Sequence, residues 1–198
     1  MITTFLFDLG GVLFTNGTKK FIRELSLSYR IPENEVKEVI DGEIGSFYRE
    51  SKITRDEFWR LVIERLHLKE SANILEKQWI DGYEIIPDTK LIITKLSKKY
   101  NLYYLSDNVK ERVDTLDKKF NFLKLFKGGI FSHEVGVRKP NPKIYEFALN
   151  KSNAKPEQTV FIDDKQIMLE PAKLSGINTI LFTTPKELEK YLLEQNLI

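Results

Sequence analysis

The feature that most constrains the fold is a set of short apolar runs spread along a chain of 198 residues. Each run is almost continuously apolar, without strict alternation, which is typical of strands covered on both faces of a sheet. The runs occupy residues 4–7, 102–105, 129–131, 159–162 and 178–182. Because helical patterns separate the later runs, the chain is expected to form a mainly parallel sheet in a doubly wound α/β fold.

Residues 16–86 differ from the rest, because they contain helical patterns and no convincing strand. Residues 54–66 open with the T-x-x-E pattern of a capping box and predict a helix. Further helices are expected over residues 21–29, 32–40 and 71–83. An enlarged loop of about seventy residues with its own structure is usually a lid or a specificity element. We therefore expect a helical cap at 16–86, and an α/β core made of residues 1–15 and 87–198.

Helix boundaries in the second half of the chain are marked by capping residues and prolines. Residues 141–142 and 184–187 each place an N-capping side chain directly before a proline, which predicts helix starts. Pro171 lies within another helical pattern, and we expect that helix to start near Met168, so that the proline falls in its first turn. Gly176 is expected to end the same helix.

Composition excludes several kinds of site and partner. The chain has no cysteine, so disulfides, thiolate metal sites and a cysteine nucleophile are excluded. Its net charge of +2 gives no electrostatic footprint for nucleic acid or for an anionic membrane. The apolar start is interrupted by Asp8 and does not read as a signal peptide, and no segment approaches the roughly 20 apolar residues of a membrane span. We expect a cytoplasmic protein, monomeric or homodimeric, without nucleic-acid or membrane partners.

Side chains suited to catalysis stand directly after three of the predicted strands. They are Asp8 after the first strand, Ser106, Asp107 and Asn108 after the second, and Asp163 and Asp164 after the fourth. Lys139 lies in a loop that precedes a capped helix. Open α/β sheets bind ligands at the carboxyl ends of their strands, so we expect these groups to share one crevice.

The motifs resemble those of the haloacid dehalogenase (HAD) superfamily of phosphatases and related hydrolases. They read FDLGGV at 7–12, LSDN at 105–108, GVRKPNPKIY at 136–145 and VFIDD at 160–164. This wording is similar to a subgroup that includes glucose-1-phosphate phosphatases and the phosphatase domain of soluble epoxide hydrolases. The resemblance covers nearly the whole chain. It implies a Rossmann-like core with strand order 3-2-1-4-5 and a type 1 helical cap.

The resemblance also implies catalytic and metal-binding roles. Asp8 would be a nucleophile that forms an aspartyl-phosphate, whereas the plain alternative is a turn residue at a strand end. Asp8, the carbonyl of Gly10, and Asp164 with support from Asp163 would hold Mg²⁺, unless the adjacent acids merely mark a solvated loop. Lys139 would bind the phosphoryl group and offset its charge.

The substrate is expected to be a small phosphorylated metabolite, such as a sugar phosphate. Ser106 and the N–H of Asp107 would hold a phosphoryl oxygen, although a serine at a strand end is more often a helix cap. Asn108 would either orient the substrate or cap the following helix. Tyr48 and Arg49, in an expected loop of the cap, are candidates for lining the substrate entrance.

Two positions depart from the family pattern. Most phosphatases of the family carry a second aspartate two residues after the nucleophile as a general acid and base, and this chain has Gly10 there. Met168 stands where many relatives place a polar residue. A catalytically weak or inactive phosphate-binding protein is therefore one alternative. A haloacid dehalogenase is another, although the Asp163–Asp164 pair is unlike the motif of that branch.

Overall fold

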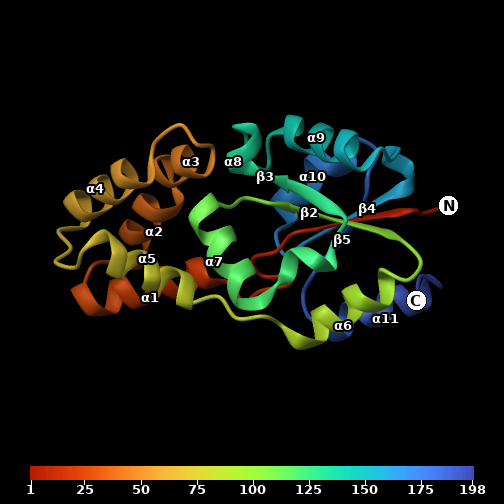
Figure 1. The fold of residues 1–198 in the computed structure, drawn as a ribbon, viewed down its shortest axis with the longest axis horizontal. Coiled ribbons are helices and arrows are strands. Elements are labelled where there is room, and N and C mark those ends of the chain that lie inside the picture. Colours follow the sequence, from red (N-terminus) through yellow and green to blue (C-terminus); the bar gives the residue numbers. More distant parts are fainter.

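A sheet of parallel strands lies at the centre of the computed structural model (Figure 1). Its strands are β1 (Thr4–Phe7), β2 (Asn101–Ser106), β3 (Gly128–Phe131), β4 (Thr159–Asp163) and β5 (Asn178–Leu181). The observed order β3-β2-β1-β4-β5 confirms the predicted strand order and the doubly wound fold. Phe7, the last residue of β1, is in register with Tyr104 and Ile162. Asp8 follows it and therefore lies beside the ends of both neighbouring strands, β2 and β4.

Helices cover both faces of this sheet, which explains why the strands are apolar without alternation. Leu6 belongs to the apolar cluster on the face covered by α9 (Pro142–Ser152) and α10 (Gln166–Leu174). Phe5 and Phe7 belong to the cluster on the other face, which is covered by α6 (Pro87–Leu96) and α11 (Pro185–Glu194). Figure 1 shows the two pairs of helices on opposite sides of the strands.

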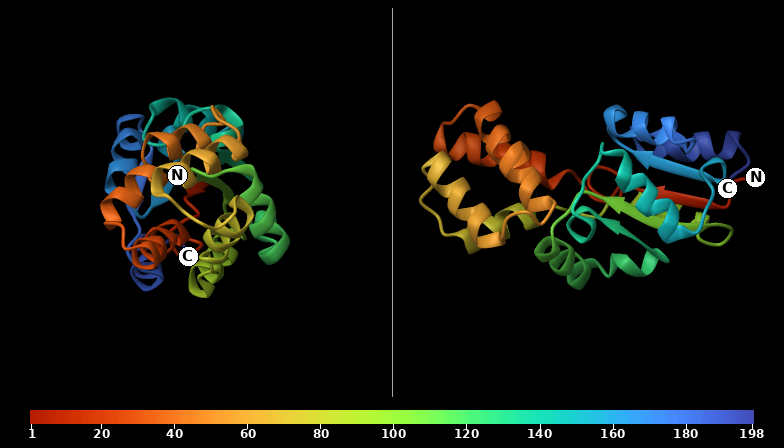
Figure 2. Two further views of the ribbon diagram at one scale, coloured as in Figure 1. Left: turned by 90° about the vertical axis from the view of Figure 1, so that its left-hand side faces the viewer. Right: turned by 90° about the horizontal axis from the view of Figure 1, so that it is seen from above.

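A group of helices lies beyond the carboxyl edge of the sheet (Figure 2). They are α1 (Gly17–Tyr29), α2 (Glu33–Asp41), α3 (Glu43–Arg49), α4 (Arg55–Leu66) and α5 (Ala72–Asp81). Aromatic side chains form much of their interior, and Phe21 stacks on Trp79 with ring centroids 5.4 Å apart. The chain enters and leaves this group along two paired segments, where Thr15 N–H donates to Glu84 O and Ile86 N–H donates to Leu13 O.

The remaining elements connect the sheet to its helices. They are α7 (Lys110–Phe120), the 3₁₀ helix η1 (Phe122–Leu125), the short helix α8 (Ser132–Val135) and the 3₁₀ helix η2 (Pro156–Gln158). None of the helices combines the length and apolar character needed to cross a membrane.

The predicted caps are confirmed and one predicted helix start is wrong. Asn141 and Thr184 accept backbone hydrogen bonds from the first turns of α9 and α11, and Gly176 follows the end of α10 at a φ of +84°. The helix expected to start near Met168 starts at Gln166, where Lys165 O already accepts from Met168 N–H at 3.0 Å. Pro171 is therefore inside the helix, where its ring removes one backbone hydrogen bond.

Candidate active site

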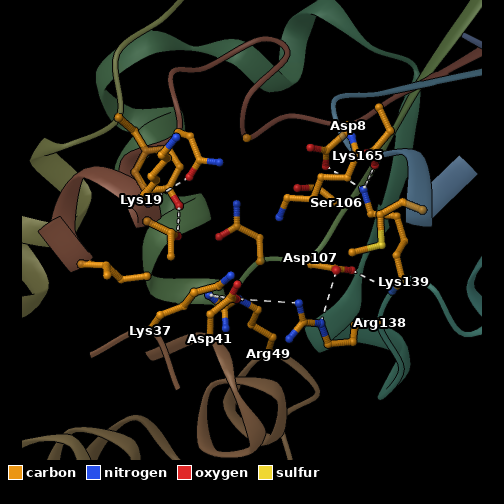
Figure 3. Close-up of a pocket in the computed structure, with 18 of the residues that line it drawn as sticks. Asp8, Lys19, Lys37, Asp41, Arg49, Ser106, Asp107, Arg138, Lys139 and Lys165 are labelled. Carbon is orange, nitrogen blue, oxygen red and sulfur yellow. Dashed lines mark hydrogen bonds and ion pairs between the residues drawn. The ribbon is translucent and has the colours of Figure 1, made fainter. Parts of the chain in front are cut away.

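A cavity of about 460 Å³ separates the carboxyl edge of the sheet from the α1–α5 helices. Most of the residues that line it are polar, since only 3 of the 19 are hydrophobic. Figure 3 shows Asp8, Ser106 and Lys139 on one side of the cavity, with Lys37, Asp41 and Arg49 grouped away from them. The structure thus brings Asp8 and the polar residues at the ends of β2 and β4 to one cavity, as the topology predicted, although Asp164 is not among the lining residues.

Asp8, Lys139 and Asp163 form a buried charged cluster at the base of this cavity. Lys139 Nζ donates to Asp8 Oδ1 at 2.8 Å and to Asp163 Oδ2 at 2.6 Å. Burial raises the pKa of Asp8, and the lysine opposes that shift. Burial lowers the pKa of Lys139, but the attraction of Asp163 and Asp8 outweighs it and raises the pKa overall, so the ammonium stays charged. The lysine is therefore fixed as a cation beside the candidate nucleophile.

Asp164 completes a cluster of three carboxylates with Asp8 and Asp163. Ligand oxygens of the three lie within 4.8 Å of one another, and the Asp164 Oδ1 atom is buried without a hydrogen-bond partner. Burial, and then the charge of Asp163, raises the pKa of Asp164. Three crowded carboxylates with one orphaned buried oxygen suit a hard divalent cation such as Mg²⁺, which prefers oxygen ligands.

The two glycines of the first motif differ in what they make possible. Gly11 has a φ of +95°, and a Cβ atom built on it would lie 2.3 Å from Asp164 Oδ2, so conformation and close approach both require glycine there. Gly10 lines the cavity with an ordinary φ, and a Cβ atom built on it would meet only Tyr83 Cε1 at 3.8 Å. Gly11 therefore makes room for the Asp164 carboxylate, whereas Gly10 leaves a space that a side chain could fill.

Ser106 ends β2, Asp107 and Asn108 follow it, and all three line the cavity. The Asp107 carboxylate is already engaged, since it accepts from Lys139 N–H at 3.0 Å and from Arg138 Nε at 3.3 Å. Asn108 Oδ1 accepts from the N–H of Val109 at the start of α7, and the Asn108 backbone is held by Ser132 and His133 from α8. Asn108 therefore supports the start of the helix and also borders the cavity, so both predicted roles stay open.

Arg138 joins the core to the α1–α5 helices at the edge of the cavity. Besides its contact with Asp107, its Nη1 donates to Ser46 Oγ at 2.8 Å, and its Nη2 lies 3.8 Å from Asp41 Oδ1. Asp41 also pairs with Arg49 at 3.2 Å. Burial lowers the pKa of Arg49 to about 10 against the opposing charge of Asp41. A continuous polar network thus runs from the segment that carries Lys139 to the helices across the cavity.

The sequence predicts the residues at the base of the cavity more completely than those on its opposite wall. Arg49 lines the cavity as suggested, but Tyr48 does not, because it stacks on Phe58 and donates to Glu111 Oε2 at 2.9 Å. Both belong to the helix α3, so the expected loop there is wrong. The lining residues that sequence reasoning missed are Asn16, Thr18, Lys19, Ile22, Glu33, Lys37, Asp41, Tyr83 and Lys165. Lys165 directly follows the VFIDD motif and could have been found from its place at the end of β4, whereas the others come from residues 16–86, where no local motif marks them.

Comparison with known proteins identifies the family. The family model of haloacid dehalogenase-like hydrolases matches residues 2–176, which is most of the chain. The chain belongs to the haloacid dehalogenase-like hydrolase family. The four motifs named above all fall within the matched residues of this hydrolase.

The relatives of this HAD-like hydrolase include phosphatases. It is 24% identical over 191 residues to D-ribitol-5-phosphate phosphatase from Bacteroides thetaiotaomicron, covering 90% of this chain and 91% of that one. It is 39% identical over 88 residues to bifunctional epoxide hydrolase 2 from Mus musculus, covering 42% of this chain and 15% of that enzyme. A HAD family enzyme from Bacteroides thetaiotaomicron, solved in complex with magnesium and inorganic phosphate, shares the fold with a TM-score of 0.77 at 24% identity, over 92% of this chain and 95% of that one.

Proposed function

We propose that this hydrolase is a Mg²⁺-dependent phosphatase of a small, polar phosphorylated metabolite, such as a sugar phosphate. The observation that carries the proposal is the cluster at the base of the cavity. There a buried lysine pairs with Asp8 and Asp163, and Asp164, which has an unpartnered buried oxygen, lies in the same cluster of carboxylates. The magnesium and phosphate in the related structure support the same reading.

Each residue of the cluster has a step in the proposed reaction. Asp8 attacks phosphorus to form an aspartyl-phosphate, which divides a difficult hydrolysis into two easier displacements. Lys139, held against Asp8 at 2.8 Å, offsets the charge of the phosphoryl oxygens in the transition state. The Ser106 hydroxyl and the Asp107 N–H donate hydrogen bonds to a phosphoryl oxygen. The Asp107 N–H is available because it donates to no backbone carbonyl.

The proposed metal site uses Asp8, the Gly10 carbonyl, Asp163 and Asp164. These oxygen donors fit Mg²⁺, which would neutralise charge on the phosphoryl group when bound. Asp163 also keeps its contact with Lys139, which holds the lysine and the carboxylates in one arrangement.

Residues 16–86 are proposed to act as a cap that selects the substrate, with 1–15 and 87–198 as the catalytic core. The cap supplies Asn16, Thr18, Lys19, Lys37 and Arg49 to the cavity wall. Together with Glu33 and Asp41 they offer hydrogen bonds and charges of both signs, while Ile22 and Tyr83 add apolar surface. A polyol or sugar phosphate fits such a wall better than an apolar phosphate ester, and the relative named for D-ribitol 5-phosphate agrees with this choice.

Phosphate release from a panel of phosphorylated metabolites, with and without Mg²⁺, tests the proposal. We expect release that needs Mg²⁺ and disappears in Asp8→Asn, whereas Asp114→Asn on the exposed surface of α7 behaves like the original chain. Release that survives Asp8→Asn would refute the nucleophile. Mg²⁺-dependent binding of inorganic phosphate without release from any ester would favour the alternative of a phosphate-binding protein that lost turnover through Gly10.

A further inference from the structure

Tyr83 occupies the space beside the position that lacks a side chain. Its ring lies between two glycines, with Cε1 3.8 Å from a Cβ atom built on Gly10. On the other edge of the ring, a Cβ atom built on Gly17 would overlap Cδ2 at 2.2 Å, so that glycine is what admits the ring. Tyr83 is only 5% exposed and yet lines the cavity. A phenol therefore stands next to the place where a side chain at residue 10 would begin.

The hydroxyl of Tyr83 belongs to a short chain of hydrogen bonds. Tyr83 Oη and Thr18 Oγ1 are 2.7 Å apart, and Trp79 Nε1 donates to Thr18 Oγ1 at 3.1 Å. An indole nitrogen can only donate, whereas each hydroxyl carries a single proton. The two hydroxyls therefore share one proton in the bond between them. The other proton is left free, on Tyr83 if Thr18 donates or on Thr18 if Tyr83 donates.

Both Tyr83 and Thr18 line the cavity, so whichever hydroxyl keeps the free proton belongs to a residue of the cavity wall. Three of the carboxylates that share the cavity are poorer donors, because each is already engaged by a positive or N–H group. Asp163 is paired with Lys139, Asp107 accepts from Arg138 and the Lys139 N–H, and Asp41 is paired with Arg49. The Tyr83–Thr18 pair is thus a protein O–H donor fixed beside Gly10.

We propose that the Tyr83–Thr18 pair protonates the leaving-group oxygen of the substrate, in place of the side chain missing at residue 10. This assignment rests on the phosphatase function proposed above. As the bond from Asp8 Oδ to phosphorus forms, the bond from phosphorus to the ester oxygen breaks, and that oxygen takes the free hydroxyl proton. If Thr18 donates it, Thr18 takes the Tyr83 proton in the same step, so the charge rests on the phenolate in both cases.

The second half-reaction restores the pair. A water molecule attacks phosphorus, gives one proton to the phenolate, and releases inorganic phosphate while Asp8 regains its carboxylate. The guanidinium of Arg112 lies 5.2 Å from the centroid of the Tyr83 ring and 3.9 Å from that of Trp79. This fixed cation stabilises the negative charge that develops on the phenol during the first half-reaction.

The dependence on the leaving group provides the test. p-Nitrophenyl phosphate has a leaving group that departs without protonation, whereas an alkyl ester such as glycerol phosphate needs a proton at the departing oxygen. General acid catalysis contributes about 10²–10⁴-fold to rate. The quantity to measure is kcat/KM for the alkyl ester divided by kcat/KM for the aryl ester. We expect Tyr83→Phe to lower this ratio by about 10²-fold or more. Thr18→Val, a second variant, is expected to lower the same ratio.

Two further variants sharpen the result. The Gly10→Asp/Tyr83→Phe double variant should recover the ratio, because a Cβ atom at residue 10 has room and the carboxyl group it carries can supply the proton. The exposed tyrosine of α11 provides the matched control Tyr191→Phe, which should leave the ratio unchanged. Glu33 is the remaining acid in the cavity wall, and Glu33→Gln tests it as a rival donor.

Equal losses for both esters in Tyr83→Phe would show a structural role and overturn the assignment. A ratio that falls in Glu33→Gln and not in Tyr83→Phe would overturn it as well. Absence of phosphate release from either ester by the unmodified chain would instead refute the phosphatase function, and the assignment with it.

Discussion

Three carboxylates and one ammonium group face one another at the carboxyl edge of the sheet, so the charges of these residues do not balance. Asp8 and Asp163 share Lys139, and Asp164 has an orphaned oxygen. Burial raises the pKa of Asp8 and of Asp164, which means that the fold holds both carboxylates at a cost. Such a cluster is stabilised by a bound cation, and the loss of one carboxylate reduces the repulsion within it.

We expect Asp164→Asn to raise the thermal midpoint of the metal-free protein and to abolish the further rise caused by Mg²⁺. Removing the least compensated carboxylate relieves repulsion, and the gain is expected to be about 2–4 °C, as for 1 kcal/mol in a chain of this size. Thermal unfolding in EDTA and in Mg²⁺ measures both effects. Asp114→Asn, an exposed carboxylate of α7, is the control. A Mg²⁺-induced rise that persists in Asp164→Asn would contradict the ligand assignment.

The adjacent glycines offer a matched pair of substitutions. Gly11→Ala places a Cβ atom 2.3 Å from Asp164 Oδ2 at a φ of +95°, whereas Gly10→Ala meets only Tyr83 Cε1 at 3.8 Å. The left-handed conformation alone costs an alanine about 1–2 kcal/mol. We expect Gly11→Ala to lower both stability and Mg²⁺ affinity, and Gly10→Ala to lower neither by a comparable amount. Denaturant titration and calorimetric Mg²⁺ binding give the comparison, and equal effects of the two alanines would count against it.

At the scale of the elements, the sequence predicts what local chemistry determines. The parallel strands follow from apolar runs, and the starts of α4, α9 and α11 follow from Thr54, Asn141 and Thr184, which cap them. The helix α3 escaped prediction because its seven residues are too few to show a period and include Gly45. A Cβ atom on Gly45 would lie 2.0 Å from Ile40 O, so the sharp turn from α2 into α3 needs glycine there, which a helical period does not reveal.

The site divides in the same way. Asp8, Ser106 and Asp163 could be predicted to meet because a parallel sheet brings the ends of β1, β2 and β4 to one edge. Thr18 and Tyr83 could not, since their meeting depends on how α1 packs against the end of α5. Sequence patterns therefore predict the base of the cavity, and the structure is needed for its wall.

Tyr48 of α3 contacts α7 across the boundary between the helical group and the sheet, which gives a pH prediction. Burial, and then the charge of Glu111, raises the pKa of its phenol above the ordinary value. Below about pH 10 the phenol is neutral in both states, and the hydrogen bond to Glu111 contributes to stability. As pH rises further, the Tyr48 phenol ionises in the unfolded chain but stays neutral in the folded chain. Ionisation then favours the unfolded state, and the free energy of unfolding falls.

We therefore expect Tyr48→Phe to be less stable than the original chain by about 1 kcal/mol at neutral pH. The difference should shrink above about pH 10, because phenylalanine does not ionise in either state. Denaturant unfolding at about pH 7.5 and about pH 10.5 measures this change, with Tyr191→Phe as the exposed control. A difference that widens with pH would contradict the assigned direction of the shift.

At the scale of the whole molecule, two bodies face each other across a polar cavity: the α1–α5 helices, and the sheet with its flanking helices. Few covalent and polar links join them. The chain crosses between them only at the paired segments near Thr15 and Glu84. Arg138 supplies a further link, since it reaches Ser46 of α3 at 2.8 Å from the segment that also carries Lys139. The helical group is thereby linked through Arg138 and Asp107 to the backbone that positions the lysine.

We expect Arg138→Ala to loosen the helical group while leaving the sheet folded. The variant loses the contacts with Ser46 and Asp41 but keeps the Lys139 N–H bond to Asp107. Small-angle X-ray scattering should then show a larger radius of gyration, and trypsin should cleave faster near Lys19 and Lys90, which flank the crossing segments. Lys143→Ala, on the exposed surface of α9, is the control and should change neither measurement. If the scattering and the cleavage rate of Arg138→Ala matched those of the original chain, the paired segments and the hydrogen bond from Tyr48 to Glu111 would be sufficient to hold the two bodies together, and Arg138 would act only within the cavity.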